Sequence, residues 1–193
     1  MSGPAPAGAL VALGAPAGAR YEATMRVAAQ PLSPESYSLY GDVIMASPHG
    51  EPGRPANRGT ARRFNHLAPV EDLRPGAATL NVCVFRCSPR LDFPLPVTLL
   101  EKHPSSTQVF LPMNARRYLV LVARGGDSPD LGSLAAFIAT GAQGVSYRPG
   151  VWHHPMIALD AEIDFSCLVW EDGTASDCVE VAYPEGEIEI VLD

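Results

Sequence analysis

The sequence predicts a single, mainly β domain, an antiparallel sandwich or small barrel with a few short helices. Short apolar segments rich in Val, Leu, Ile and Phe recur at spacings of roughly ten to twenty residues, which is typical of these folds. The 17 glycines and 19 prolines supply turns between the segments. With 193 residues, of which 47% are hydrophobic and 18% charged, the chain is long enough to bury one sizeable core.

The N-terminal region differs in composition from the rest of the chain. Residues 1–26 are rich in Ala, Gly and Pro, so we expect a disordered N-terminal extension followed by one folded domain over residues 27–193. No acidic residue precedes Glu22, which leaves organellar import through this extension open beside a cytoplasmic location. No apolar run reaches 18 residues, so we expect no membrane contact.

The folded part is expected to begin with a short helix and a strand. In S-P-E-S-Y-S-L-Y-G, Ser33 is a candidate N-cap, Pro34 suits the first helical position and Gly41 ends the helix. The following D-V-I-M, residues 42–45, predicts a strand. Residues 47–60 are dense in Pro and Gly and predict a loop.

Strands are expected to dominate the remainder. The segment T-L-N-V-C-V-F-R-C predicts a buried strand over residues 79–87, and shorter strands are expected over residues 97–103, 117–123, 145–147, 165–170 and 187–192. One helix is expected over residues 129–141, with Ser128 as its cap and Gly141 at its end. Its apolar positions at helical spacing are Leu131, Leu134, Ala135 and Ile138.

Charge and cysteine content limit the class of partner. The net charge of -7 argues against a nucleic-acid-binding surface, because such a surface needs a basic face. The four cysteines form no C-x-x-C pair, and Cys83 and Cys87 would lie about 13 Å apart on one strand face, too far for a disulfide. We expect a reduced chain without a thiolate zinc site.

The segment V-T-L-L-E-K-H, residues 97–103, predicts a strand that runs from a packed core to a polar cavity. With a period of two, Val97, Leu99, Glu101 and His103 share one face. Gln108 follows five residues later, at the start of the next expected strand. The alternatives are a surface ion pair between Glu101 and His103 and a core amide at Gln108.

The second polar segment is R-P-G-V-W-H-H-P, residues 148–155. Two adjacent histidines follow a Pro-Gly turn, and neighbours on a strand point to opposite faces. At most one of His153 and His154 is therefore expected to face a buried site.

Together these segments resemble the two metal-binding motifs of the cupins. The resemblance implies a cupin-type antiparallel β-barrel, or jelly roll, in which His153 points inward while Trp152 and His154 point away. In place of the family's usual residues, Glu101 replaces a histidine and Gln108 replaces a glutamate. The matching positions are Glu101, His103, Gln108, Gly144, Pro149, Gly150 and His153.

Three longer segments resemble one cupin family, the ureidoglycolate lyases of allantoin and purine breakdown. They are P-L-S-P-E-S-Y-S-L-Y-G-D-V-I, E-K-H-P-S-S-T-Q-V-F-L-P, and P-D-L-G-S-L-A-A-F-I-A-T-G-A-Q-G-V-S-Y-R-P-G-V-W-H-H-P. The resemblance runs through most of residues 31–184. It implies cleavage of (S)-ureidoglycolate to glyoxylate and urea, by a homodimer with which a divalent metal is associated.

The resemblance also implies roles for individual residues. Glu101, His103, Gln108 and His153 would hold a divalent metal, Ni or otherwise Mn or Zn, without an organic cofactor. Without a metal, His103 or His153 would act as the base and Glu101 would orient it.

Two further residues are candidates for binding the substrate. Arg63, in T-A-R-R-F-N-H-L, is expected to bind the substrate carboxylate, since the planar guanidinium matches a carboxylate. Asn81 alternates with Cys83 and is expected to donate to a carboxylate or urea oxygen. Either residue is alternatively a plain structural polar group.

Two other functions stay open. One is another metal-dependent cupin acting on a small hydroxy acid, and the other is a non-catalytic cupin that binds such an acid. Turnover of ureidoglycolate and its dependence on metal distinguish these from the lyase.

Overall fold

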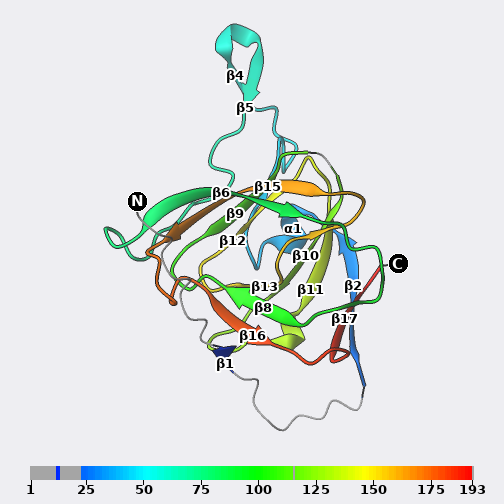
Figure 1. Ribbon diagram of the computed structural model, residues 1–193. Helices are drawn as coiled ribbons and strands as arrows, with labels where there is room; N and C mark the ends of the chain where they lie inside the picture. The colour runs from blue at the N-terminus through cyan, green and yellow to red at the C-terminus, as the bar shows by residue number, and fades with distance from the viewer. Residues whose placement is uncertain (1–11, 14–22, 115, 193) are drawn as a thin grey trace, which may run out of the picture.

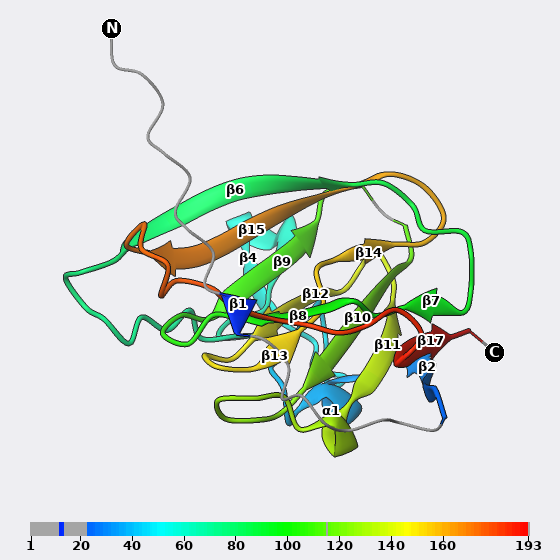
Figure 2. The ribbon, with the colours of Figure 1, turned by 60° about the horizontal axis from the view of Figure 1, so that its bottom comes forward.

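The protein folds into two facing β-sheets that form a barrel (Figures 1 and 2). The computed structural model describes residues 12–13, 23–114 and 116–192. Most strand pairs are antiparallel, and the helical segments are short. This arrangement confirms the predicted mainly β, cupin-type barrel with a few short helices.

The larger sheet has ten strands. Its main path has the order β1-β16-β8-β13-β10-β11-β2-β17-β7, and β14 pairs with β10 beside it. The bounds are β1 (Ala12–Leu13), β2 (Met25–Pro31), β7 (Leu95–Pro96), β8 (Leu99–Lys102), β10 (Tyr118–Ala123), β11 (Ala135–Ala139), β13 (Trp152–His153), β14 (Ile157–Ala158), β16 (Val179–Ala182) and β17 (Ile188–Val191).

The smaller sheet has five strands in the order β3-β12-β9-β15-β6, and β4 pairs with β5 in a separate hairpin. The bounds are β3 (Val43–Ile44), β6 (Thr79–Cys87), β9 (Gln108–Pro112), β12 (Gly144–Tyr147), β15 (Ile163–Glu171), β4 (Arg54–Ala56) and β5 (Ala61–Arg63). The helical segments are α1 (Pro34–Tyr37), η1 (Asn57–Gly59) and η2 (Leu131–Ser133).

Two apolar clusters pack on opposite faces of β10. Val120 and Val122 belong to the cluster that lies between the two sheets, whereas Leu119 and Leu121 belong to a second cluster. All six residues of β10 are buried, which explains why the segment Y-L-V-L-V-A lacks polar positions. The barrel interior and the outer face of the larger sheet are therefore both packed, and β10 supports the strands around it.

The predicted helix start at Ser33 is confirmed. The Ser33 hydroxyl accepts from Ser36 N, and the Ser36 hydroxyl accepts from Ser33 N, which is a reciprocal capping box at the first turn of α1. Pro34 occupies the first turn as expected. The predicted strand after it is also present, as β3.

The predicted helix over residues 129–141 is wrong. Only the turn η2 forms there, and the chain then enters β11, which pairs with β10 and β2. Phe137 packs in the cluster between the sheets and Ala136 packs in the second cluster, an alternation that only a strand provides. An isolated helix of this length is only marginally stable. Pairing of β11 with β10 on one edge and β2 on the other therefore outweighs the helical spacing of the apolar residues.

The predicted strand over residues 79–87 has the expected bounds but is not buried. Among the described strands it pairs with β15 alone, and it forms the edge of the smaller sheet. Leu80, Val82 and Val84 are 38%, 63% and 58% exposed. A continuous apolar run is typical of a central strand, and this edge strand shows that burial does not follow from that run alone.

The loop predicted over residues 47–60 contains structure at its end. Residues 54–56 form β4, which pairs with β5 in a hairpin that projects from the barrel at the top of Figure 1. The remaining predicted strands are present with shifted bounds: residues 97–103 correspond to β8, and residues 117–123, 145–147, 165–170 and 187–192 to β10, β12, β15 and β17.

The predicted N-terminal extension lies largely outside the described residues. Within it, Ala12–Leu13 pairs with β16 as β1, and Met25 and Arg26 belong to β2. Among the described residues, no helix is long and apolar enough to cross a membrane.

Candidate active site and metal centre

Strand pairing places Glu101 and His153 side by side. They are direct partners in the β8–β13 register, and Glu180 of β16 is the partner of Glu101 on its other side. Partners in a sheet share a face, so all three side chains point to the same side. Gly150, with φ of 80°, makes the turn before β13, and its N–H donates to His103 O at 2.9 Å. That bond joins the turn to the end of β8, where His103 lies.

Three of the four predicted metal ligands converge. One ligand atom each from Glu101, His103 and His153 lie within 4.8 Å of one another. Glu101 Oε1 is 3.5 Å from His153 Nε2, and the two imidazole rings stack with centroids 5.8 Å apart. The histidines are 8% and 1% exposed, so water has little access to this acid-base cluster.

The backbone sets which nitrogen of each imidazole faces the cluster. His103 Nδ1 lies 2.8 Å from Asp177 O, and His153 Nδ1 lies 3.0 Å from Val151 O. A carbonyl only accepts, so Nδ1 carries the proton in both rings and Nε2 presents a lone pair. This is the usual arrangement of a histidine that ligates a metal.

Two buried polar atoms of the predicted metal ligands lack hydrogen-bond partners. They are His153 Nε2 and Gln108 Oε1, on residues that are 1% and 3% exposed. A buried acceptor without a hydrogen-bond partner lowers the stability of a protein by about 1–3 kcal/mol. Such an acceptor therefore normally has a partner in the native protein. Two imidazole nitrogens, a carboxylate and an amide oxygen are acceptors without a donor among them, which fits a divalent cation of the Ni, Mn or Zn type.

Burial and charge set the protonation states. Burial lowers the pKa of His103 to about 4, and repulsion from His153 adds to that, so the ring is neutral at pH 7. For Glu101, burial acts to raise the pKa, but the interaction with the His153 side chain and the proximity of His103 outweigh it and lower the pKa. The cluster therefore holds an ionised carboxylate next to a neutral imidazole.

A second group shares Glu101 and was not predicted from the sequence. Ligand atoms of Glu101, Cys178 and Glu180 also lie within 4.8 Å of one another, and Cys178 Sγ is 3.9 Å from Glu101 Oε2. Burial, followed by repulsion from Glu101 and Glu180, raises the pKa of Cys178 to about 12, so the thiol keeps its proton. The C-V-E spacing at the start of β16 was the available signal, because residues two apart in an extended segment share a face.

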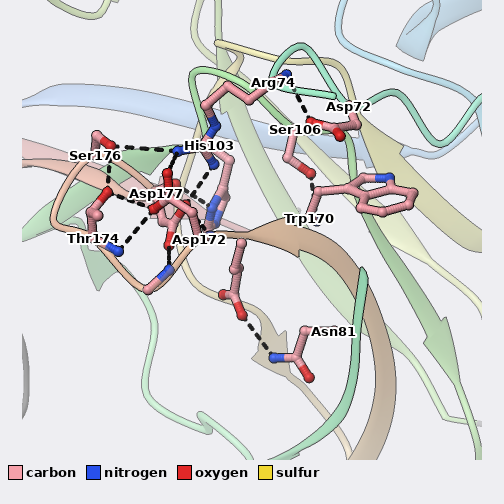
Figure 3. A network of polar contacts seen from close by, with 12 residues as sticks. Asp72, Arg74, Asn81, His103, Ser106, Trp170, Asp172, Thr174, Ser176 and Asp177 are labelled. Carbon is pink, nitrogen blue, oxygen red and sulfur yellow. Dashed lines mark hydrogen bonds and ion pairs between the residues drawn. The ribbon is translucent and has the colours of Figure 1, made fainter. Parts of the chain in front are cut away.

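A polar network outside the cluster fixes His103 (Figure 3). Arg74 contacts Asp172 and Asp177 at 2.6 Å each, and the Asp177 carboxylate accepts from Asp172 N and Gly173 N. The carbonyl of the same Asp177 holds His103 Nδ1. The sequence offered no signal for this network, since Arg74 lies far from both acids along the chain.

Packing surrounds His153 on the barrel side. Tyr147 stacks on His153 with centroids 4.0 Å apart and planes 6° apart. Trp152 is fully buried in the second cluster, on the opposite face of the sheet, as alternation predicted. His154 follows β13, donates from Nδ1 to Pro155 O, and lines a cavity of about 520 Å³ together with Arg90, Met156 and Glu185.

The two predicted substrate-binding residues are not brought to the cluster. Asn81 lies on the edge strand β6 and donates to Glu171 Oε2 at 2.8 Å. Arg63 lies on the projecting β4–β5 hairpin and is exposed. Among the described residues, neither forms a hydrogen bond or ion pair with Glu101, His103 or His153.

Comparison with known proteins gives consistent results. The family model described as ureidoglycolate lyase matches residues 24–191. Curated relatives named ureidoglycolate lyase include one from Pseudomonas fluorescens, 37% identical over 82% of this chain and 92% of its own length. Another, from Pseudomonas aeruginosa, is 36% identical over 85% of this chain and 94% of its own length.

A solved structure is also similar. It is RmlC from Streptococcus suis in complex with dTDP-D-xylose, with 16% identity and a TM-score of 0.40, matched over 67% of this chain and 62% of that chain.

Proposed function

Because the chain belongs to the ureidoglycolate lyase family, we propose that its barrel breaks the C–N bond of (S)-ureidoglycolate and releases glyoxylate and urea. The observation that carries this is the convergence of Glu101, His103 and His153 within 4.8 Å, with acceptor atoms left unpaired. A substrate with a carboxylate and a hydroxyl on one carbon suits such a site.

The reaction requires a base at the substrate hydroxyl and an acid at the urea nitrogen, which are bonded to the same carbon. The substrate hydroxyl loses its proton and its electrons form the new C=O of glyoxylate. The C–N bond breaks with its electron pair on nitrogen, which takes up a proton and leaves as urea. The site must therefore accept one proton and supply one.

The residues of the cluster fit these tasks. A divalent cation held by Glu101, His103, Gln108 and His153 would supply Lewis-acid polarisation of the substrate oxygens. In the metal-free alternative, Nε2 of His153, which lies 3.5 Å from Glu101 Oε1, takes the hydroxyl proton, and Glu101 stabilises the imidazolium that results. The same imidazolium returns the proton to the urea nitrogen. His103, neutral and fixed by Asp177 O, orients the substrate from the other side.

We also propose that the protein works as a homodimer through β6. Its outer edge pairs with no strand among the described residues, and Leu80, Val82 and Val84 present an exposed apolar face. Exposed, unpaired apolar edges are sites of association. Val82→Glu with Val84→Glu should shift the sedimentation of the protein to that of a monomer. Leu39→Glu, at a site 62% exposed on the α1 end, is the matched control.

The compartment proposed is a reducing one, the cytoplasm. All four cysteines are free, and Cys83 lies opposite Cys167 in the β6–β15 register without a disulfide. Cell fractionation of the full chain and of a chain lacking residues 1–22 tests this, and import of the full chain alone into an organelle would contradict it.

Turnover with and without metal tests the activity. Chelator-treated protein is supplied with racemic ureidoglycolate, and glyoxylate and urea are measured after addition of Ni, Mn or Zn. Loss of both products on chelation and recovery with one metal supports the metal-bound site. Activity that survives chelation keeps the lyase and leaves the proton transfers to the side chains alone. Ammonia in place of urea contradicts the proposed products, and no glyoxylate under any condition leaves a binding protein.

A further inference from the structure

Two cysteines face each other across the β6–β15 strand pair. Cys83 of β6 is the direct partner of Cys167 of β15 in the antiparallel register. Direct partners in such a pair have Cα atoms about 4.5 or 5.5 Å apart, and a disulfide spans Cα separations of about 4.4–6.8 Å. The side chains of direct partners also point to the same face of the sheet. The two thiols are therefore placed to form a disulfide without a large movement of the backbone.

Both thiols lie on the side of the smaller sheet that faces the larger sheet. Cys167 is fully buried in the apolar cluster between the sheets, and Cys83 packs against that cluster while it keeps part of its surface exposed. Burial raises the pKa of the Cys167 thiol, and the neighbouring Cys83 thiol raises it further. Both cysteines are free. The pair is thus a dithiol with one accessible and one shielded sulfur.

The other two cysteines are placed differently. Cys87 belongs to the same strand pair, but its direct partner is Ile163. Cys178 lies just before β16, which belongs to the larger sheet. Among the described strand pairs, Cys83 and Cys167 are the one pair of cysteines in direct register.

Cys167 is also close to a predicted metal ligand. On its other side Cys167 pairs with Phe110, and Gln108, two residues earlier on β9, pairs with Val169. Gln108 and Cys167 are therefore diagonal neighbours on one face of the sheet. Burial is the main influence on the pKa of Cys167, and the nearby Gln108 side chain acts in the opposite direction and lowers it. A shift of the Cys167 sulfur toward β6 would change the packing around the Gln108 amide.

We propose that Cys83 and Cys167 are a site of reversible oxidation, at which a peroxide forms a disulfide that weakens metal binding through Gln108. The effect on metal binding rests on the proposed function of the cluster. The bond itself is not needed for the fold, because β6 and β15 already pair over their full lengths. Transient disulfides of this kind are found in reducing compartments, where permanent ones are rare.

The chemistry requires only the two thiols and hydrogen peroxide. The thiolate of Cys83, the more accessible sulfur, attacks a peroxide oxygen, and the O–O bond breaks to leave a sulfenic acid and one water. The Cys167 thiol then attacks the Cys83 sulfur, the S–O bond breaks, and a second water leaves. The two sulfurs lose two electrons in total, and the peroxide takes them up. A small thiol reductant reverses the reaction by exchange.

Peptide mapping of the oxidised protein tests the bond. Metal-free protein is treated with hydrogen peroxide, the remaining thiols are blocked, and the digest is analysed without a reductant. A peptide pair joined through Cys83 and Cys167 should appear, and should disappear after dithiothreitol. Cys83→Ala should give no joined pair, whereas Cys87→Ala, at the cysteine opposite Ile163, should give the wild-type product. Thiols that stay unlinked, or a bond from Cys83 to another cysteine, would overturn the proposal.

Calorimetric titration of the same samples with Ni tests the effect on the cluster. Binding should be about 10-fold weaker in the oxidised wild type, and should return to its original strength after reduction. Oxidised Cys83→Ala should bind Ni as the untreated variant does. Unchanged binding in the linked protein overturns the effect on Gln108. Equal weakening in oxidised Cys83→Ala also overturns it, because the oxidation then acts at another residue.

Turnover of ureidoglycolate should fall on oxidation and recover on reduction, in parallel with Ni binding. The two physical measurements keep this proposal separate from the proposed function. A protein that forms the bond and loses Ni affinity but cleaves no ureidoglycolate would refute the lyase and keep the oxidation site. A lyase that forms no bond between Cys83 and Cys167 would keep the proposed function and refute the oxidation site.

Discussion

Glu101 lies directly opposite His153 in the β8–β13 pair, with Oε1 3.5 Å from Nε2, and this relationship organises the site. The strand pairing brings together two residues that are far apart in the chain and turns both toward the barrel interior. The carboxylate keeps Nε2 directed at the cluster, while Val151 O holds the opposite nitrogen.

Replacement of Glu101 by Gln should remove activity while the fold remains. Gln keeps the shape but not the charge, so a bound cation loses a ligand or, in the metal-free alternative, the imidazolium of His153 loses its stabilising charge. We expect turnover to fall by about 100-fold or more, with bound metal, measured by plasma mass spectrometry, falling in parallel. Glu162→Gln, at an exposed carboxylate that pairs with Arg86, is the control. Wild-type turnover in the Glu101 variant would contradict the site.

Substitutions of Gln108 distinguish the two roles considered for it, a metal ligand and an amide packed in the core. Its Oε1 is buried and unpaired. Gln108→Glu should tighten metal binding, since a carboxylate is the stronger ligand, whereas Gln108→Leu should weaken it by about 10-fold or more. Titration of the stripped protein with Ni or Zn measures both. If both variants bind metal as the wild type does and differ only in melting temperature, Gln108 is a core amide.

The stability of the protein should rise with pH between about 4 and 6.5. The pKa of His103 is lowered to about 4 in the folded state from 6.5, so in this interval the unfolded chain binds the additional proton. The contribution of the neutral His103 to the free energy of unfolding is complete above pH 6.5 and is lost as the pH falls through 4. This contribution is on the order of 3 kcal/mol.

Urea unfolding of the stripped protein at pH 7 and pH 4.5 measures this difference. His103→Asn should reduce the slope of stability against pH. His66→Asn, at an exposed histidine with φ of 57° that Asn tolerates, should leave the slope unchanged. An equal slope in wild type and His103→Asn would contradict the assignment.

Arg74 should act as a positioning residue through Asp177. Arg74→Ala releases both carboxylates, so the carbonyl that holds His103 Nδ1 loses its fixed place. We expect kcat to fall by about 10- to 100-fold and the acid limb of the pH–rate profile to shift, with Arg74→Lys recovering part of both. Arg117→Ala breaks a comparable pair with Asp160 and is the control. An unchanged pH profile in Arg74→Ala would show that the pair is only structural.

Local pattern predicted much of this molecule. Serine followed by proline specified the start of α1, because capping is decided within one helical turn. Alternation predicted that Glu101 and His103 share a face and that at most one of His153 and His154 faces inward. The resemblance to the cupin motifs implied that Glu101, His103 and His153 meet, and the structure brings them together. Burial of Trp152 on the opposite face followed from the same period.

Pairing between distant segments decided the rest. The segment at residues 129–141 has helical spacing, yet β10 and β2 lie on either side and turn it into β11. The apolar run at residues 79–87 forms an exposed edge because β15 is the only strand that pairs with it in the described part of the chain. The Arg74–Asp177 contact joins residues that no local pattern connects.

The sequence by itself determined the β class and which residues share a strand face, because side-chain direction along a strand is set by the backbone of a few neighbouring residues. Its motifs also resembled one family, and that resemblance implied the three residues of the cluster. Only the tertiary structure decided which strands are covered, which nitrogens face inward and where Arg63 stands. Those properties depend on the order in which strands pair, and that order is set by contacts between parts of the chain that are far apart in sequence.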